Sequence, residues 1–457
     1  MKGAGSVSIL CFLSPVIVSL MGFGLLYLMG QPQHPQPPRE LLSFKPQGFT
    51  FGEYHRAFSR PRYFFKDEYT DGHILIVGGA GAGKSSGLAI PSLRSWSSSV
   101  FAIDIKGELS AATAHSPGPC KIFNPMDENS CGVDAYYLLR HSDNPAQVAK
   151  EIAVTIIPQP ANIKDPFWVQ AAQNLLTGFV LHYQAAGLSF IQTITEILRP
   201  DIHIDEHIKY VLDVSRNEAA KFHMSQFATL EGKTLAGIFA ELSNQIMLFA
   251  TDEHVKSALS KENNISPEDL EQGYKIFLNI PEDKLDQWKP LVTLITNQFL
   301  KHFERRPDNN AAPILFLLDE FARLGKIEAI ATGLTTLRSK KITIALIIQS
   351  LAQLDYLYGP ALRRVILDNC SYKAILGATD ADTQEYFSRL VGTKEATRQG
   401  ESSSYEPDSG EQRGYTVSQH IIDRRIIQPH EFATLGDVVL LSPWGYHRAG
   451  KIRPVVA

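Results

Sequence analysis

The stretch "HILIVGGAGAGKSS", residues 73–86, decides the fold class of this chain. An apolar run of strand length leads into a glycine-rich turn with the spacing G-x-x-x-x-G-K-[ST]. Such glycines let successive backbone N–H groups converge on phosphate oxygens, and the next helix adds its positive dipole end. The alternative is a strand-to-helix turn that contains a lysine by chance. Because a strand pattern precedes the turn and the helix-compatible "LAIPSL" follows it, the sequence favours a phosphate-binding loop.

The residues of this loop predict a nucleotide and a metal ion as cofactors. Lys84 can reach the β- and γ-phosphates, and the Ser85 hydroxyl can ligate Mg²⁺. The sequence therefore predicts that the chain binds ATP with Mg²⁺ and hydrolyses it. The residues expected to contact the nucleotide are Gly78, Gly79, Ala80, Gly81, Ala82, Gly83, Lys84, Ser85 and Ser86.

A second motif supplies the groups that hydrolysis needs. "ILFLLDEFARL", residues 314–324, places Asp319 and Glu320 at the C-terminal end of an apolar strand pattern. Asp319 is predicted to hold Mg²⁺ through its water shell, and Glu320 to orient and deprotonate the attacking water. The alternative is a carboxylate pair that caps the next helix. Gln349 ends a neighbouring strand pattern and is predicted to lie beside the γ-phosphate, although a polar residue at a strand end is also ordinary.

The pattern along the chain predicts an α/β fold with a mostly parallel sheet. Short apolar runs alternate with amphipathic stretches, and their near-continuous apolarity is typical of strands buried on both faces. Candidate strands begin at His73, Ser98, Tyr274, Ala312, Lys341 and Tyr372. Residues 160–262 have helical periodicity and predict an all-α domain, inserted between a first part (42–159) and a second part (263–457) of the nucleotide-binding domain. Residues 395–420 are polar and poor in aliphatics, and predict a mobile loop.

The N-terminus predicts a single transmembrane anchor. Residues 7–30 carry no charge over a length that can cross the ~30 Å hydrocarbon core of a bilayer. A cleaved signal peptide is the alternative, but the following "QPQHPQPPRE" offers no small-residue cleavage site. Residues 31–41 read as a proline-rich, extended linker. Basic residues follow the apolar run, so the bulk of the chain is predicted to lie in the cytoplasm.

Composition excludes several classes of protein. The chain has 457 residues and a formal net charge of −4, which excludes a wholly basic nucleic-acid coat but not a local basic stripe. The four cysteines form no CxxC pair, so neither a disulfide framework nor a zinc site is indicated.

Taken together, the nucleotide motifs, the inserted helical domain and the anchor resemble a known family. The chain is similar to the type IV secretion coupling proteins, the TraG/TraD-type conjugation motors of the RecA/FtsK-like branch. The similarity covers roughly residue 42 to the C-terminus, and residues 317–354 are its most specific part. The other stretches that carry it are "FAIDIKGELSAATA" (101–114), "DPFWVQAAQNLL" (165–176) and "RRIIQPHEFATL" (424–435).

The resemblance implies a RecA-like P-loop NTPase fold and roles for further residues. Arg338 corresponds to the arginine that enters a neighbouring subunit's nucleotide site, where a guanidinium stabilises charge on the γ-phosphoryl group. The alternative is a surface arginine beside Lys340 and Lys341 on a solvated helix end. For Asp104, Lys106 and Glu108 two interpretations stay open: a link from the nucleotide site to a pore, or a cap for the helix that follows.

The resemblance also implies the function. The expected protein is a ring ATPase of six subunits, anchored by a single pass in the bacterial inner membrane. It would recruit single-stranded DNA with its relaxase, effector proteins or both, and pass them to a type IV secretion channel and its ATPases. This chain departs from the family in having one apolar segment where members usually have two, and in its compact helical domain.

Two other functions remain as alternatives. One is an FtsK-like DNA translocase, and the other is a substrate-receptor platform that uses nucleotide only for assembly. Charge alone does not show DNA binding, because basic pairs such as Arg305–Arg306, Arg363–Arg364 and Arg424–Arg425 are more often solvated or ion-paired.

Overall fold

A computed structural model of the chain describes residues 37–56, 58–114, 116–160, 163–309, 311–405 and 412–452. The chain divides into two units, Met1–Arg39 and Glu40–Ala457, and the architecture below is that of the second. The predicted anchor at residues 7–30 lies outside the described residues, as does most of the predicted linker. Within the described ranges, no helix combines the length and apolarity that crossing a bilayer requires.

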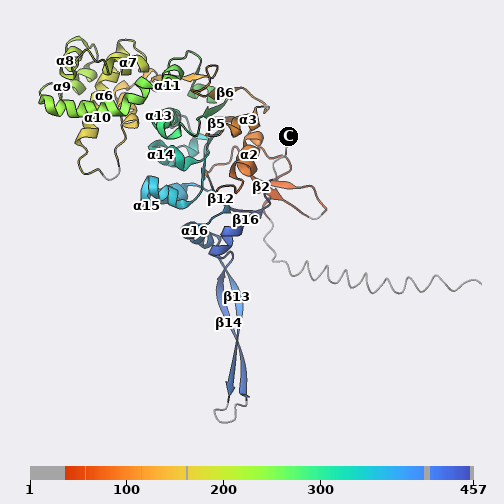
Figure 1. Cartoon of the computed structure of the whole chain (residues 1–457). Helices are drawn as coiled ribbons and strands as arrows, with labels where there is room; N and C mark the ends of the chain where they lie inside the picture. The colour runs from red at the N-terminus through yellow and green to blue at the C-terminus, as the bar shows by residue number, and fades with distance from the viewer. Residues whose placement is uncertain are drawn as a thin grey trace, which may run out of the picture. The chain divides into compact units, whose positions relative to one another are not determined.

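A nine-stranded sheet organises this unit (Figure 1). Its order is β16-β15-β12-β4-β11-β10-β5-β9-β6, and the strands from β12 to β6 are parallel. The parallel strands are β12 (Tyr372–Gly377), β4 (Ile74–Gly78), β11 (Ile342–Ile348), β10 (Ile314–Leu318), β5 (Ser99–Asp104), β9 (Lys275–Asn279) and β6 (Cys120–Phe123). The antiparallel edge consists of β15 (Val438–Ser442) and β16 (Gly445–Ala449). The predicted α/β fold with a mostly parallel sheet is confirmed, and every candidate strand forms.

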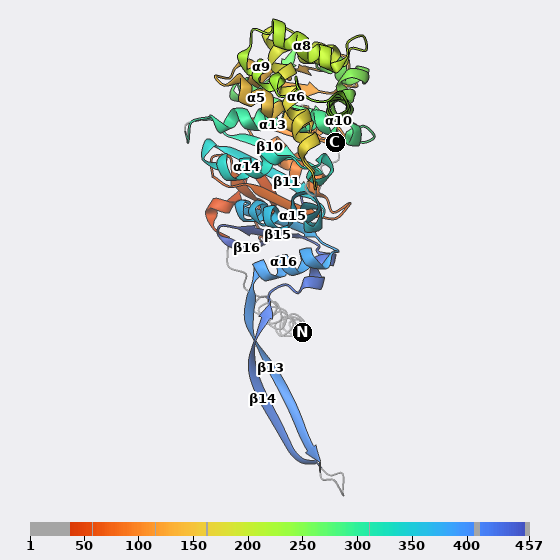
Figure 2. The same cartoon turned by 90° about the vertical axis from the view of Figure 1, so that its left-hand side faces the viewer.

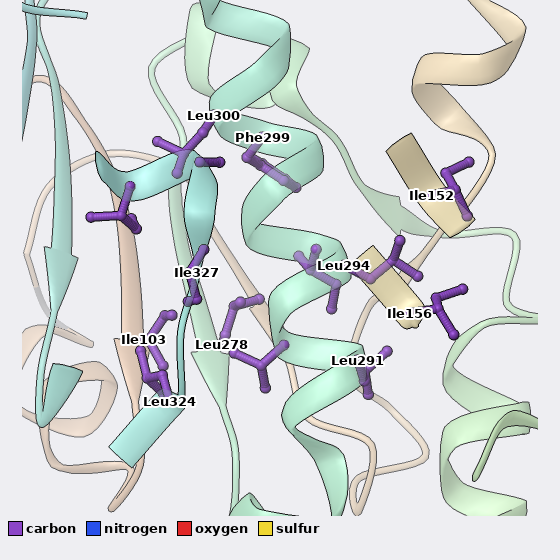
Figure 3. Packing of buried hydrophobic residues seen from close by; sticks show 14 of the residues in the cluster. Ile103, Ile152, Ile156, Leu278, Leu291, Leu294, Phe299, Leu300, Leu324 and Ile327 are labelled. Carbon is purple, nitrogen blue, oxygen red and sulfur yellow. The ribbon is translucent and has the colours of Figure 1, made fainter. Parts of the chain in front are cut away.

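One face of the sheet packs on helices. Every residue of β4, β10 and β11 is buried. Because successive side chains of a strand point to opposite faces, both faces of the sheet are covered here. On the first face, α13 (Leu285–Glu304) and α5 (Pro145–Ile156) lie over the strands. Figure 3 shows the packing of aliphatic side chains from these elements, including Ile103 of β5, Leu291 of α13 and Ile156 of α5. The same side carries α14 (Glu328–Thr336) and α15 (Leu351–Asn369) (Figure 1).

The opposite face is covered by shorter elements. Helices α2 (Ile90–Ser95) and α3 (Glu108–Thr113) pack there with a three-stranded antiparallel sheet. That sheet consists of β1 (Leu42–Ser43), β3 (Arg62–Asp67) and β2 (Gly48–Tyr54). The hydroxyl of Ser92 on α2 accepts the backbone N–H of Thr50 on β2 at 2.9 Å. Glu53 of β2 forms a bridge with Gly450, just after β16, so the small sheet adjoins the antiparallel edge of the large one.

A group of helices lies beyond the β6 end of the sheet (Figures 1 and 2). It follows the pair α4 (Tyr137–Arg140) and α5, and precedes α12 (Pro267–Glu271). Its helices are α6 (Phe167–Ala185), α7 (Phe190–Ile197), α8 (Ile204–Val214), α9 (Glu218–Ser225), α10 (Gly232–Thr251) and α11 (Glu253–Ala258). Strands β7 (Gly132–Val133) and β8 (Asn264–Ile265) pair in parallel at its base. The segment predicted as all-α is therefore helical within its described residues.

The prediction of a mobile loop at residues 395–420 is wrong, because the described residues of this segment lie in two strands. After α16 (Ala381–Val391), strands β13 (Thr393–Tyr405) and β14 (Gln412–Arg425) form an antiparallel hairpin that returns to η5 (Pro429–Thr434). Figure 2 shows the hairpin extending from the β15–β16 end of the sheet, opposite the helical group. A two-stranded ribbon is held by backbone hydrogen bonds, so it does not need the aliphatic pattern by which core strands are recognised.

Candidate nucleotide site

The sheet brings the predicted phosphate loop, Asp319, Glu320 and Gln349 together at the carboxyl ends of its parallel strands. Neighbouring parallel strands end in register, with Val77 of β4 opposite Ile348 of β11 and Leu346 of β11 opposite Leu318 of β10. The glycine-rich loop after β4, Gln349 after β11 and Asp319 after β10 therefore emerge side by side. In open α/β sheets ligands bind in this crevice, outside the carboxyl ends of the strands.

The loop has the conformations that its glycines permit. Gly81 and Gly83 have φ of +73° and +90°, in the left-handed region where side chains with a Cβ are strained. Gly78 is required for close packing, since a Cβ there would lie 3.2 Å from both Ala82 Cβ and Lys84 Cγ. The chain then enters η2 (Ser85–Ala89), a helical turn with π-type spacing that continues as α2. The loop thus ends at a helix N-terminus, as phosphate cradles do.

Lys84 lies over this loop. Its Nζ donates to the carbonyl oxygens of Gly78 at 2.6 Å and Gly79 at 2.9 Å. Burial lowers the pKa of Lys84, and the nearby carboxylates of Asp319 and Glu320 act in the opposite direction. The ammonium group is therefore held between the loop and the carboxylates that follow β10.

Ser85 and Asp319 meet in a direct hydrogen bond. Ser85 Oγ donates to Asp319 Oδ2 at 3.0 Å. Burial raises the pKa of Asp319, with the charge of Glu320 as a further contribution, while Ser85 and Lys84 lower it. A hydroxyl and a carboxylate are oxygen ligands that suit Mg²⁺, which typically takes one or two protein groups and completes its shell with phosphates and water. These residues fit a magnesium ion, and a cation here would offset the burial of the Asp319 charge.

Glu320 has an unusual backbone conformation. Its φ of 46° and ψ of 41° place a non-glycine residue in the left-handed region, a strain that tends to occur at functional sites. Two cations orient its carboxylate: Lys106 at 3.5 Å and Arg323 at 3.2 Å. Arg323 also pairs with Glu282 at 2.5 Å. Glu320 makes no side-chain capping hydrogen bond for η3 (Phe321–Leu324), while Asp319 Oδ1 accepts the backbone N–H of Glu320 at 3.0 Å.

Asp104, Lys106 and Glu108, which end or follow β5, take different positions. The buried Asp104 carboxylate accepts the backbone N–H of Ser110 at 2.8 Å and its hydroxyl at 2.9 Å, so it holds the first turn of α3. Glu108 is exposed in that turn. Lys106 instead reaches Glu320. The capping interpretation therefore fits Asp104, whereas Lys106 belongs to the candidate nucleotide site.

Gln349 lies at the site edge and Arg338 does not. Gln349 is exposed, and its backbone N–H donates to Gln353 Oε1 at 2.9 Å. Arg338 occupies η4 (Arg338–Lys340), which directly precedes β11. It therefore lies at the amino end of that strand, whereas the phosphate loop lies at the carboxyl ends. It lies near His73, whose pKa falls to about 3 through burial, with further contributions from the charges of Lys66 and Arg338. At about 3.3 Å per residue, β11 separates Arg338 from the loop of its own chain by roughly 20 Å.

The turn that carries Arg338 is held by contacts that the sequence did not predict. The buried Arg306 guanidinium donates to the carbonyl oxygen of Lys340 at 2.9 Å and pairs with Glu271 at 2.7 Å. Asp308 accepts the hydroxyl of Ser339 at 2.7 Å and pairs with Lys340 at 2.9 Å. Arg338 itself is exposed and makes no ion pair within the described ranges. The contacts of Arg306 and Asp308 therefore hold the turn in place, and the exposed Arg338 guanidinium faces outward.

Comparison with known proteins identifies the family. The family model described as type IV secretory system conjugative DNA transfer matches residues 39–441. The chain belongs to this family. The resemblance to type IV secretion coupling proteins is thereby confirmed.

Curated relatives support this assignment. VirD4 of Agrobacterium fabrum (strain C58 / ATCC 33970) is 27% identical over 344 residues, which cover 73% of this chain and 51% of VirD4. The conjugal transfer protein TraG of Rhizobium radiobacter is 22% identical over 388 residues, which cover 81% of this chain and 60% of TraG. The chain thus spans about half to three fifths of the length of these relatives.

Solved structures share the fold. The bacterial conjugative coupling protein TrwB, in a crystal form with sulphate, has a TM-score of 0.65 and 18% identity, covering 83% of this chain and 85% of the TrwB chain. TrwB in complex with ADP and Mg²⁺ has a TM-score of 0.63 and 16% identity, with the same coverage.

Proposed function

We propose that the chain is a P-loop NTPase of RecA-like type that hydrolyses ATP to drive substrate transfer. The hydrogen bond between Ser85 and Asp319 carries this proposal, because it joins the helix after the phosphate loop to the strand end that bears Glu320. The loop residues 78–86 would hold the phosphates. Ser85 and Asp319 would hold Mg²⁺, which neutralises charge on the β- and γ-phosphate oxygens.

Glu320 would act as the general base. Its carboxylate oxygen would take the proton of the attacking water, and its left-handed backbone conformation is the kind of strain that tends to occur at functional sites. Lys106 and Arg323 would hold the carboxylate in place between turnovers. Lys84 would contact the β- and γ-phosphates, and Gln349 would lie beside the γ-phosphate from the adjacent strand end.

Arg338 would act on the nucleotide of a neighbouring subunit. It lies at the sheet edge opposite its own loop, is exposed, and has no ion-pair partner among the described residues to retain it. Supplying this charge in trans makes hydrolysis depend on assembly, which agrees with a ring of six subunits. The fixed turn around it keeps the guanidinium ready for that contact.

Substrate and location follow from the family. We propose an inner-membrane-anchored coupling protein that delivers single-stranded DNA with its relaxase, effector proteins or both to a type IV secretion channel and its ATPases. The anchor is the apolar run at residues 7–30. The alternatives remain an FtsK-like translocase and a receptor platform that binds nucleotide without turnover.

Nucleotide turnover by the full chain tests the proposal. ATP hydrolysis would be measured in detergent with and without single-stranded DNA, beside Lys84→Ala and Glu320→Gln. Turnover that both substitutions abolish supports the motor, and its stimulation by DNA favours DNA as substrate. If both variants retain turnover, or if wild type shows no turnover, the chain is not a motor of this kind. The receptor platform would then be the remaining function.

A further inference from the structure

Within residues 393–399 and 417–425, one face of the hairpin β13–β14 carries basic residues and no carboxylate, whereas the other carries Glu395, Asp423 and Arg425. In an antiparallel pair, residues directly opposite each other point to the same face. The register places Lys394 opposite Arg424 and Arg398 opposite His420, with Ala396 opposite Ile422 between them. These six residues alternate along their strands and therefore share one face, which we call the basic face.

The carboxylates lie on the other face. Glu395 pairs across the ribbon with Asp423, and Thr397 with Ile421. Within residues 393–399 and 417–425, the basic face has no carboxylate at all. Other lysines of this chain pair with a carboxylate one helical turn away, as Lys209 does with Asp205 and Lys221 with Glu218. The basic face offers its cations no such carboxylate within the residues given above.

The charges on the basic face have no partner within the described residues. Lys394, Arg398, His420 and Arg424 are exposed and form no ion pair in this part of the chain. Glu385 of α16, the helix before the hairpin, is bound by Arg389 at 2.7 Å and by Arg425 at 2.9 Å. Like charges directly opposite on a ribbon destabilise it. An anionic partner would remove that repulsion.

We propose that the basic face binds the phosphate backbone of duplex DNA. The major groove of B-DNA, about 12 Å wide, admits a two-stranded β-ribbon. Lys394 and Arg398 lie roughly 13 Å apart along the strand, from about 3.3 Å per residue, so they can contact different phosphates along the DNA. Single strands are usually bound by stacking on aromatic rings. The basic face carries no Phe, Tyr or Trp among its described residues, which favours a duplex.

Binding of a 30-base-pair duplex by the full chain tests this interaction. Fluorescence anisotropy without nucleotide, across a series of KCl concentrations, would compare wild type with Lys394→Gln/Arg398→Gln/Arg424→Gln. We expect at least tenfold weaker binding and a salt slope reduced by about 2.7, at about 0.9 for each phosphate that the variant no longer neutralises. A control with the same change in net charge, Lys209→Gln/Lys221→Gln/Lys256→Gln, should bind like wild type. The charge-preserving Lys394→Arg/Arg398→Lys/Arg424→Lys should also bind like wild type, which excludes misfolding as the cause.

Several results would overturn the proposal. Unchanged affinity and slope in the glutamine variant would show that the hairpin does not contact DNA. The wild-type affinity for a 30-nucleotide single strand could equal that for the duplex, and the glutamine variant could lose as much affinity for each. That result would show that the ribbon does not select a duplex. Loss of binding to phosphatidylglycerol vesicles with DNA binding intact would assign the face to lipid. Hydrolysis of ATP without DNA should be the same in the glutamine variant and wild type, so failure here is distinguishable from failure of the proposed ATPase.

Discussion

Ser85 Oγ lies 3.0 Å from Asp319 Oδ2, although 234 positions separate the two residues in the sequence. The contact exists because β4 and β10 are parallel strands separated only by β11, so the segments that follow them emerge at the same sheet edge. It brings the hydroxyl that we propose as a Mg²⁺ ligand against a buried carboxylate. Burial of that carboxylate works against folding. A buried carboxylate of this kind is therefore expected at a functional site and does not serve stability.

Replacement of Asp319 by asparagine should therefore separate stability from magnesium binding. Burial raises the pKa of Asp319, so between its ordinary and its raised pKa the folded state binds more protons than the unfolded state. Its contribution to stability then falls as the pH rises through that interval. We expect Asp319→Asn to raise the melting temperature at pH 7.5 without ligand and to lose the stabilisation that ATP with Mg²⁺ gives wild type.

Thermal melts of the two proteins, with ATP and with or without Mg²⁺, would measure this. The exposed Asp213→Asn is the matched control and should melt like wild type in every condition. A melting temperature for Asp319→Asn that still rises with Mg²⁺ would contradict the assigned ligand.

Glu320→Gln should bind nucleotide and fail to hydrolyse it. The amide keeps the shape of the side chain but cannot take a proton, so turnover should fall by about 10²–10⁴-fold, as loss of a general base does. Lys84→Ala should also weaken ATP binding, since it removes a group that binds phosphate. Single-turnover hydrolysis and equilibrium binding of a fluorescent ATP analogue would distinguish the two. Equal loss of affinity in both variants would contradict the separate roles.

The parallel strands and the phosphate loop could be predicted because their signals are local. Strands buried on both faces read as continuous apolar runs, and the loop has a fixed spacing of glycine, lysine and serine. The edge strand β6, "CKIF", is short and partly exposed, and it left no comparable signal. Strands β13 and β14 escaped prediction because polar residues serve a ribbon as well as they serve a loop.

Contacts between distant segments could not be predicted. Lys106 reaches Glu320 only because β5 and β10 are neighbours in the sheet, and nothing near either residue in the sequence encodes that order. The spacing of Arg323 from Glu320, one helical turn, is a local signal from which that pair could have been predicted. The sequence gives no reason to distinguish Arg305 from Arg306. In the structure Arg305 is exposed and Arg306 is buried.

Arg306 and Arg305 should differ sharply in their effect on stability. The Arg306 guanidinium is buried, with Glu271 at 2.7 Å and carbonyl oxygens of Lys340 and Ala312 at 2.9 and 2.8 Å. Its loss should reduce the free energy of unfolding by about 1.5–3 kcal/mol, as loss of hydrogen bonds to a charged group does, since Glu271 itself is exposed. The exposed Arg305→Ala should change it by less than about 0.5 kcal/mol. Urea denaturation of Arg306→Ala and Arg305→Ala would measure both, and similar midpoints would contradict the assignment.

Arg338→Ala should abolish turnover within assembled rings while leaving nucleotide binding intact. Loss of an arginine finger typically lowers the rate by roughly 10³-fold or more. Because Arg338 lies at the sheet edge opposite its own phosphate loop, the substituted chain still offers a complete loop to its neighbour. Mixed assembly should therefore restore activity: Arg338→Ala supplies the loop and Lys84→Ala the guanidinium, with about a quarter of randomly formed interfaces intact.

A control mixture makes this test specific for the pair. Lys84 and Glu320 lie close enough for their charges to interact within one chain, so Lys84→Ala mixed with Glu320→Gln should recover nothing. ATP hydrolysis would be measured for each variant alone and for both equimolar mixtures, assembled together from dissociated subunits. If the mixture of Arg338→Ala with Lys84→Ala stays inactive although mixed rings form, Arg338 does not serve a neighbouring site. Activity in the control mixture would instead place Glu320 and Lys84 in sites of different subunits.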